Sequence, residues 1–204
     1  MFKKIIFTFI PILIIFSSIF IYKNIEAENY RDNLDYLSSI KLDELNQNTE
    51  KWKFIQDVSE DAIINYKKYN ILPSITISQA ILESDFGNSD LSKENNNLFG
   101  IKSDDSNKSI DYKTDEYIDG KKVQVIAGFE TFKTKGESID RHSLLFVDGT
   151  TDNPDRYKKV LQAENYEDAA IEVQKAGYAT DPSYSKKLIS IIREWKLYIY
   201  DKWL

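Results

Sequence analysis

This chain of 204 residues contains no cysteine and only one histidine, His142. Without cysteine it forms no disulfide and offers no thiolate to a metal ion, and a single histidine argues against a zinc site. The sequence also has no glycine-rich phosphate loop, no internal repeat and no block of basic residues. Its net charge of −6 argues against nucleic acid as a partner, because phosphate binding requires a positive face.

The chain does contain enough apolar material for a folded core. Hydrophobic residues make up 42% of the sequence, which is typical of a globular protein, and the length suits one domain plus appendages. We interpret His142 as structural, because no second ligand candidate lies near it in the sequence.

The N-terminus carries a long apolar run, Ile5–Tyr22, behind the basic residues Lys3 and Lys4. Its length suits a bilayer core, and the two lysines favour a cytoplasmic tail, with everything after Lys23 exported. A cleaved signal peptide is the alternative. We favour an uncleaved anchor, because the run is long for a signal core and its end lacks the small residues of a cleavage site. We therefore expect a tail and membrane anchor over residues 1–23 and a polar spacer over 24–50.

Two helices are predicted next, one within Lys51–Asn70 and one that starts at Pro73. Proline fits the first turn of a helix, and Ser74 is the expected side-chain cap. Apolar residues cover most of the second helix, so we expect it to be buried. Gly87 is the expected stop, because glycine enters the left-handed conformation without strain.

Glu83 then lies in the last turn of this buried helix. The negative end of the helix dipole and burial both disfavour a carboxylate, and both raise its pKa. A carboxyl that keeps its proton near neutral pH is what a general acid requires. On spacing alone, an ordinary surface glutamate near a helix end stays the alternative.

A β-hairpin is predicted around Asp119-Gly120, with strands over Tyr112–Ile118 and Lys121–Phe129. The expected pairs are Ile118 with Lys121, Glu116 with Val123, and Thr114 with Val125. Paired residues share a face, so Glu116 lies among aliphatic residues while Asp115 points the other way. The alternative is a hairpin exposed on both faces, in which Glu116 pairs with Lys121.

Further helices are expected on both sides of a loop at 148–155. Thr134–Glu137 is a capping box that opens one of them. The others are Tyr157–Gln162, Tyr166–Lys175 with Asn165 as its cap, and a final helix capped by Asp181 whose apolar face runs to Ile199.

Several of these stretches resemble the glucosaminidase domain of glycoside hydrolase family 73, the peptidoglycan N-acetylglucosaminidases. The matching strings, in order, are SITISQAILESDFG, NNLFGIK, TDEYIDGKKV, FETF, GESIDRH and GYATDPSYSKKL. The resemblance covers residues 51–204 and implies an α+β, mainly α fold. That fold is a lysozyme-like helical domain with a small β-hairpin lobe, preceded here by one N-terminal transmembrane helix.

The resemblance also implies roles for five residues. Glu83 matches the catalytic acid, Glu116 the second acidic residue, and Tyr178 a tyrosine that borders the cleft. Asn97 and Phe99 would face the substrate, although plain core packing stays open for Phe99 and for Tyr178. No metal or organic cofactor is implied.

The implied protein is a membrane-anchored endo-β-N-acetylglucosaminidase that hydrolyses β-1,4 bonds of peptidoglycan glycan strands in wall remodelling or autolysis. It would be a single-pass protein of the cell membrane, with its domain outside and other cell-wall enzymes as further candidate partners. Glycosidases generally need a second carboxylate as base or nucleophile, unless the substrate acetamido group takes that part. The rival functions are a lytic transglycosylase or muramidase, and a non-catalytic scaffold that binds glycan.

Overall fold

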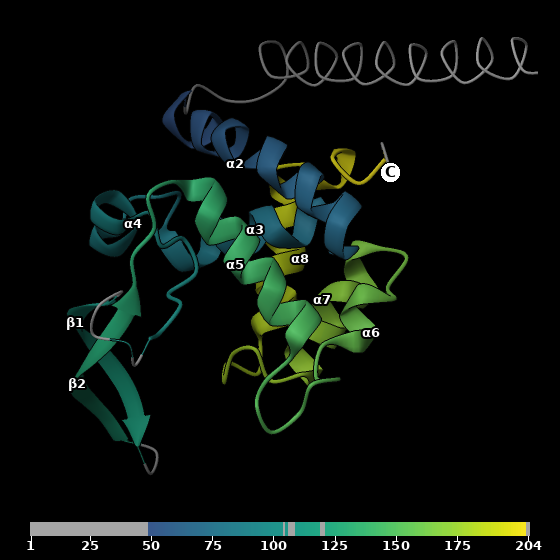
Figure 1. Cartoon of the computed structure of the whole chain (residues 1–204). Helices are drawn as coiled ribbons and strands as arrows, with labels where there is room; N and C mark the ends of the chain where they lie inside the picture. Colours follow the sequence, from purple (N-terminus) through teal and green to yellow (C-terminus); the bar gives the residue numbers. More distant parts are fainter. Residues whose placement is uncertain (1–48, 104, 106–108, 119–120, 203–204) are drawn as a thin grey trace, which may run out of the picture. The chain divides into compact units, whose positions relative to one another are not determined.

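Helices dominate the computed structural model, which describes residues 49–103, 105, 109–118 and 121–202 (Figure 1). The helices are α2 (Thr49–Tyr69), α3 (Pro73–Ser84), α4 (Asp90–Asn95), α5 (Lys135–Asp148), α6 (Lys158–Leu161), α7 (Tyr166–Lys175), α8 (Tyr184–Glu194) and the 3-10 helix η1 (Leu197–Ile199). Two antiparallel strands, β1 (Ser109–Ile118) and β2 (Lys121–Glu130), form the only sheet in this described part. The expected mainly helical fold with a small hairpin is confirmed.

The predicted membrane anchor over residues 1–23 lies outside the described residues, as does the predicted spacer up to residue 48. Within the described part of the chain, every helix is too short or too polar to cross a bilayer.

Helix α3 lies at the centre of the helical domain, where it contacts α2, α7, α8 and η1. All its residues from Pro73 to Ile81 are buried, as its apolar pattern predicted. The largest fully buried apolar side chains outside α3 come from α2, α5, α8, η1 and two connecting segments: Ile55, Ile71, Leu98, Ile139, Phe146, Leu188, Ile192 and Leu197. The helix that carries Glu83 is therefore held rigidly by the core.

The N-terminus of α3 is capped by a residue from the far end of the chain. Leu72 occupies the N-cap position and makes no capping bond with its side chain. Asp201 instead accepts hydrogen bonds from the backbone N–H of Ser74, at 2.9 Å, and from its hydroxyl, at 2.6 Å. The prediction of Ser74 as the cap was wrong, because this serine lies inside the first turn and donates to a carboxylate.

The C-terminus of α3 comes earlier than predicted. The helix ends at Ser84, and Asp85 takes the left-handed cap conformation with φ 50°. Phe86 and Gly87 follow with φ 54° and 75°, so Gly87 is the third residue of a left-handed run and not the stop. Glycine is still required there, because a Cβ would lie 2.8 Å from the ring of Phe54.

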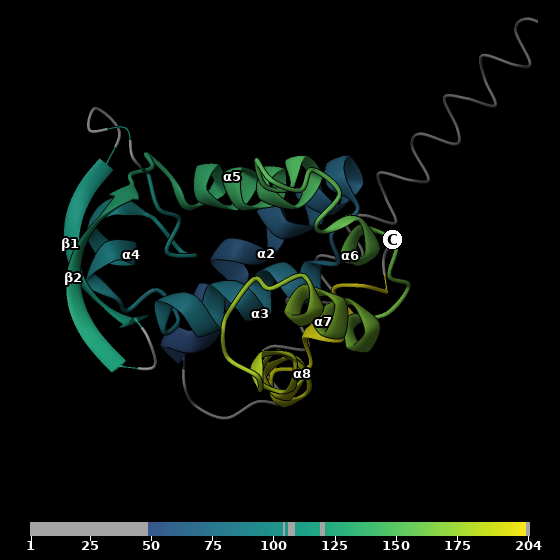
Figure 2. The same ribbon diagram turned by 90° about the horizontal axis from the view of Figure 1, so that it is seen from below.

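The hairpin has the predicted register. Ile118 pairs with Lys121, Glu116 with Val123 and Thr114 with Val125, while the strands extend further at their open ends than predicted. The turn at 119–120 and the side chains of residues 114–122 lie outside the described part, so the predicted face of Glu116 stays a prediction. At the base, the Tyr112 hydroxyl donates to Glu94 and accepts from Asn95 of α4. The hairpin curves at one end of the domain beside α4 (Figure 2).

The predicted caps of α5 and α7 are confirmed. The Thr134 hydroxyl accepts from the N–H of Glu137 at 3.1 Å, and Asn165 accepts from the N–H of Asp168 at 2.8 Å. The reciprocal bond of the capping box goes one residue further back than expected, because Glu137 accepts from the N–H of Lys133.

The final helix is shorter than predicted at both ends. Asp181 accepts from the N–H of Ser183, so it caps a turn that precedes the first residue of α8, Tyr184. The helix ends at Glu194, and Lys196 adopts a left-handed conformation before η1. The continuous apolar pattern to Ile199 concealed this break.

Candidate active site

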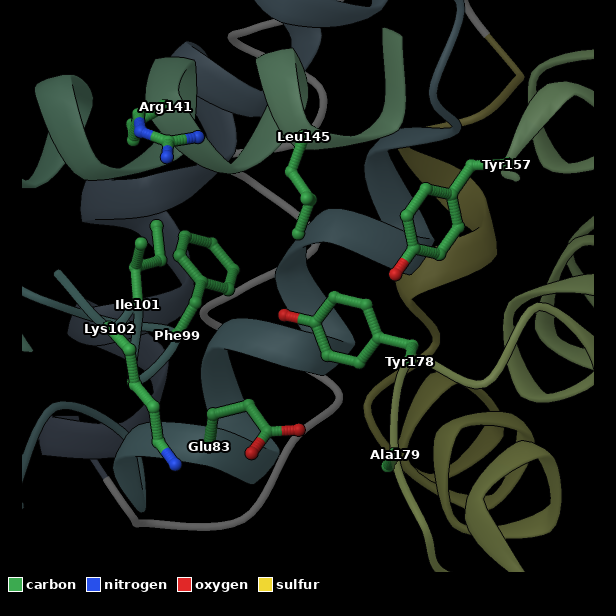
Figure 3. A pocket seen from close by; sticks show the side chains of 10 residues that line it. Glu83, Phe99, Ile101, Lys102, Arg141, Leu145, Tyr157, Tyr178 and Ala179 are labelled. Carbon is green, nitrogen blue, oxygen red and sulfur yellow. The ribbon is translucent and has the colours of Figure 1, made fainter. Parts of the chain in front are cut away.

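A pocket of about 340 Å³ opens beside the last turn of α3 (Figure 3). Its other walls come from the segment after α4, from α5 and from the loops before α6 and α8. The lining residues are Glu83, Phe99, Gly100, Ile101, Lys102, Arg141, Leu145, Tyr157, Tyr178 and Ala179. The structure thus brings together three of the five predicted site residues: Glu83, Phe99 and Tyr178.

Glu83 occupies the predicted position in the last turn of α3, but its side chain is exposed to the pocket and is not enclosed. The surrounding protein still removes enough water that desolvation raises the pKa of this carboxyl above its ordinary value. A hydrogen bond from Tyr184 and the positive charge of Lys187 act against this rise. The net result is a carboxyl that holds its proton more tightly than a free glutamate.

Tyr184 is the site residue that the sequence interpretation missed. Its hydroxyl donates to Oε1 of Glu83 at 2.6 Å, and Nε2 of Gln79 donates to the tyrosine oxygen at 3.1 Å. In the sequence, Tyr184 fits the apolar face of the last helix and gives no sign of a role at the site. The two bonded residues are 101 positions apart, so no local spacing pattern signals their contact. The one available signal was Gln79, a buried amide one helical turn before Glu83.

Tyr178 lies at the rim of the pocket and also packs against other aromatic rings. Its ring stacks on Tyr184 at 5.7 Å and on Phe146 at 5.8 Å between centroids. Its hydroxyl points into the pocket between Phe99 and Leu145 (Figure 3). Burial, and then the nearby Glu83 carboxyl, raise the pKa of Tyr178, so the hydroxyl stays protonated and available as a donor.

Phe99 combines the two roles that the sequence left open, pocket lining and core packing. It lines the pocket, and its ring also stacks on the buried His142 with centroids 3.9 Å apart. At 5% exposure, little of its surface is accessible from the pocket.

Asn97 does not face the pocket as expected. It is buried, and its amide nitrogen donates to the carbonyls of Ile101 and Glu130, both at 2.9 Å. Its oxygen accepts from the N–H groups of Phe99 and Ile101. Residues 97–102 form the wall segment of the pocket that follows α4. Asn97 therefore fixes the backbone of this wall segment by hydrogen bonds and links it to the end of β2.

The pocket wall also carries two cations, Lys102 and Arg141. Arg141 pairs with Glu130 at 3.1 Å, which joins α5 to the end of β2. The side chain of Glu116, the second predicted carboxylate, lies outside the described part, although its backbone pairing is known. Over the described residues there is no cluster of histidine and acidic side chains suited to a metal ion.

A sequence profile for the glucosaminidase family, described as mannosyl-glycoprotein endo-beta-N-acetylglucosaminidase, matches residues 59–197. The chain belongs to this family. The match includes α3, the wall segment, the hairpin and Tyr178, so the pocket is built entirely from the glucosaminidase region.

Two curated relatives show what this glucosaminidase domain is similar to. The exo-glucosaminidase LytG of Bacillus subtilis is 47% identical over 153 residues, which are 75% of this chain and 54% of LytG. The peptidoglycan hydrolase FlgJ of Salmonella typhimurium is 33% identical over 149 residues, 70% of this chain and 46% of FlgJ. The chain thus spans about half the length of these relatives.

A solved structure shares the fold. The catalytic domain of the autolysin Auto from Listeria monocytogenes is 35% identical, with a TM-score of 0.71, and the match covers 85% of this chain and 97% of that domain. The glucosaminidase fold expected from the sequence is therefore confirmed.

Proposed function

We propose that this protein hydrolyses β-1,4 glycosidic bonds of peptidoglycan glycan strands as an endo-β-N-acetylglucosaminidase, with Glu83 as the general acid. The observation that carries the proposal is the Glu83 carboxyl, which faces a pocket from the end of a buried helix and has a raised pKa. Such a group holds its proton more tightly than a free glutamate and lies where a glycosidic oxygen can reach it.

The chemistry needs one proton donor and one electron-rich partner. Glu83 gives its proton to the departing glycosidic oxygen as the bond to the anomeric carbon breaks. Positive charge then develops at that carbon and is stabilised either by a carboxylate or by the substrate's own acetamido oxygen. Glu116 is the candidate carboxylate, and Tyr178 is the candidate hydrogen-bond donor to the sugar. Water then adds its hydroxyl group to the anomeric carbon and gives its proton to a carboxylate, and Glu83 regains a proton from that water directly or through the solvent.

The choice of substrate draws on the relatives. LytG is named an exo-glucosaminidase and FlgJ a peptidoglycan hydrolase, while the family profile is described as an endo-β-N-acetylglucosaminidase, and the endo mode of this proposal follows the profile. A pocket with aromatic side chains and hydroxyl groups suits sugar rings, which present apolar faces and polar edges.

The location is part of the same proposal. The apolar run Ile5–Tyr22 behind Lys3 and Lys4 would hold the protein in the cell membrane, with the catalytic domain outside. There it would meet glycan strands and other enzymes of the cell wall.

The test is to digest purified sacculi with the wild-type chain and with Glu83→Gln, and to identify the new chain ends by mass spectrometry. The variant should lose a factor of about a hundred to ten thousand in rate, because general acid catalysis contributes that much. Asp85→Asn is the matched control, since Asp85 is exposed, two positions away, and asparagine tolerates its left-handed backbone.

Reducing N-acetylglucosamine ends support the proposal. Anhydro-muramic ends would assign a lytic transglycosylase, and reducing muramic ends a muramidase. Glycan binding without any new ends would assign a scaffold, and full activity in Glu83→Gln would remove Glu83 as the acid.

A further inference from the structure

Two buried side chains that do not line the pocket control one oxygen of Glu83. Tyr184 is 3% exposed and Gln79 is fully buried, and neither belongs to the pocket wall. The tyrosine hydroxyl lies between two side chains of α3 that are one turn apart, with Gln79 at 3.1 Å on one side and Glu83 at 2.6 Å on the other.

The direction of these bonds follows from the groups involved. The Gln79 amide nitrogen only donates, so it occupies a lone pair of the tyrosine oxygen and leaves the single hydroxyl proton for Glu83. Tyr184 cannot act as a base here, because burial and the neighbouring Glu83 raise its pKa far above its ordinary value. The chain of donors therefore runs one way, from Gln79 through Tyr184 to Oε1 of Glu83.

We propose that Tyr184, oriented by Gln79, is a positioning residue that holds Oε1 of Glu83 and reserves Oε2 as the oxygen that carries the transferred proton. This inference rests on the function proposed above. A bond from a hydroxyl to a carboxylate is stronger than the same bond to a neutral acid. The contact therefore strengthens as Glu83 gives up its proton, so it favours the transition state over the bound substrate.

The test compares Tyr184→Phe with wild type on soluble glycan fragments of alternating N-acetylglucosamine and N-acetylmuramic acid. We expect kcat to fall by about 10- to 100-fold, because the loss of a hydrogen bond to a charged group in the transition state lowers a rate by about that factor. KM should stay within about twofold, because Tyr184 is absent from the pocket wall.

The pH profile separates positioning from simple structural support. The hydroxyl bond lowers the pKa of Glu83, so its loss should move the descending limb of kcat/KM to higher pH. Tyr200→Phe is the matched control. Tyr200 is likewise 3% exposed, and its hydroxyl lies near Ser59; neither of these two residues lines the pocket. Tyr200→Phe should change neither kcat nor the pH of the descending limb of kcat/KM.

Gln79→Met provides a second variant that keeps the tyrosine. It should lower kcat less than Tyr184→Phe and shift the limb in the same direction, and it should add nothing in the Tyr184→Phe background. Unchanged kcat and pH limb in Tyr184→Phe would overturn the inference, and so would a change confined to KM. If Glu83→Gln is inactive while Tyr184→Phe equals wild type, only this inference fails. If Glu83→Gln is active, the proposed function fails first.

Discussion

Desolvation acts on Glu83 and on His142 with opposite consequences. Loss of water disfavours the charged form of any group, so it raises the pKa of the Glu83 acid and lowers that of the His142 base to about 3. His142 is fully buried between Phe99 and Phe146, and neither of its ring nitrogens finds a hydrogen-bond partner among the described residues. The histidine is therefore neutral, and its part is to support the ring of Phe99 at the pocket wall.

A neutral buried histidine should make the domain sensitive to acid. Below pH 6.5 His142 binds a proton in the unfolded chain but stays unprotonated in the folded chain. The free energy of unfolding therefore falls as pH drops from 6.5 to about 3. The slope approaches about 1.4 kcal/mol per pH unit. His142→Phe keeps a ring in the stack, removes two unpaired nitrogens and should lose this slope. Denaturant unfolding of both proteins at pH 7 and pH 5 measures it.

The pH dependence of stability must be compared between wild type and His142→Phe, because the curve of either protein alone contains contributions from other groups. The pKa values of Glu83 and Asp201 are raised, so these acids contribute the opposite slope, with stability gained as pH falls. They are present in both proteins and cancel in the difference. Parallel stability curves for wild type and His142→Phe would contradict the prediction.

The element that most depends on a distant partner is α3. Its first turn receives no side-chain cap from Leu72, and the N–H of Ser74 donates instead to the carboxylate of Asp201. Removing a capping side chain costs about 0.5–2 kcal/mol. Asp201→Ala should therefore lower the free energy of unfolding by about 1 kcal/mol, measured by urea denaturation at pH 7.

A matched control for the cap is Asp155→Ala. Asp155 is an exposed aspartate whose side chain pairs with the nearby Lys158 at 3.5 Å. Such surface pairs contribute little, so this change should stay within about 0.5 kcal/mol. Equal losses of unfolding free energy in the two variants would show that Asp201 does not stabilise α3 as a cap.

The hairpin makes a prediction about two adjacent acids. From strand alternation we expect Asp115 and Glu116 to point to opposite faces, and from the pairing of Glu116 with Val123 we expect Glu116 on the more apolar face. Glu116→Gln should therefore lower kcat less than Glu83→Gln, and more than Asp115→Asn, its matched control. The loss should be about a hundred- to ten-thousandfold if Glu116 is the base, and smaller if the acetamido group is the nucleophile.

Kinetics of the three variants on soluble glycan fragments decide the point. An inactive Asp115→Asn beside a fully active Glu116→Gln would reverse the assignment of the two faces.

For the molecule as a whole, the contacts that could be predicted are those between neighbours in sequence. The Thr134 cap of α5 and the hairpin register each depend on a few adjacent residues, and both are confirmed. The bonds of Ser74 to Asp201 and of Glu83 to Tyr184 span 127 and 101 positions, and no spacing pattern encodes such distances. The placement of Glu83 and Tyr178 in one pocket came from the family resemblance, and Asn97 shows where that resemblance misled.

The last prediction concerns the whole chain in the cell. The run Ile5–Tyr22 would span about 27 Å as a helix, close to the thickness of a bilayer core. The full-length protein should therefore fractionate with membranes, resist extraction by salt or carbonate, and be released by detergent. Protease added to cells stripped of their wall should digest the domain, because Lys3 and Lys4 favour a cytoplasmic tail.

A chain that lacks residues 5–22 is the control and should be recovered in the soluble fraction. The N-terminal sequence of the membrane protein distinguishes an anchor from a signal peptide, because only an anchor keeps the apolar run. Mature protein that begins near Glu26 and accumulates in the culture medium would refute the anchor. In that case the enzyme would diffuse to its glycan strands, whereas an anchored one is confined to the strands within reach of the membrane.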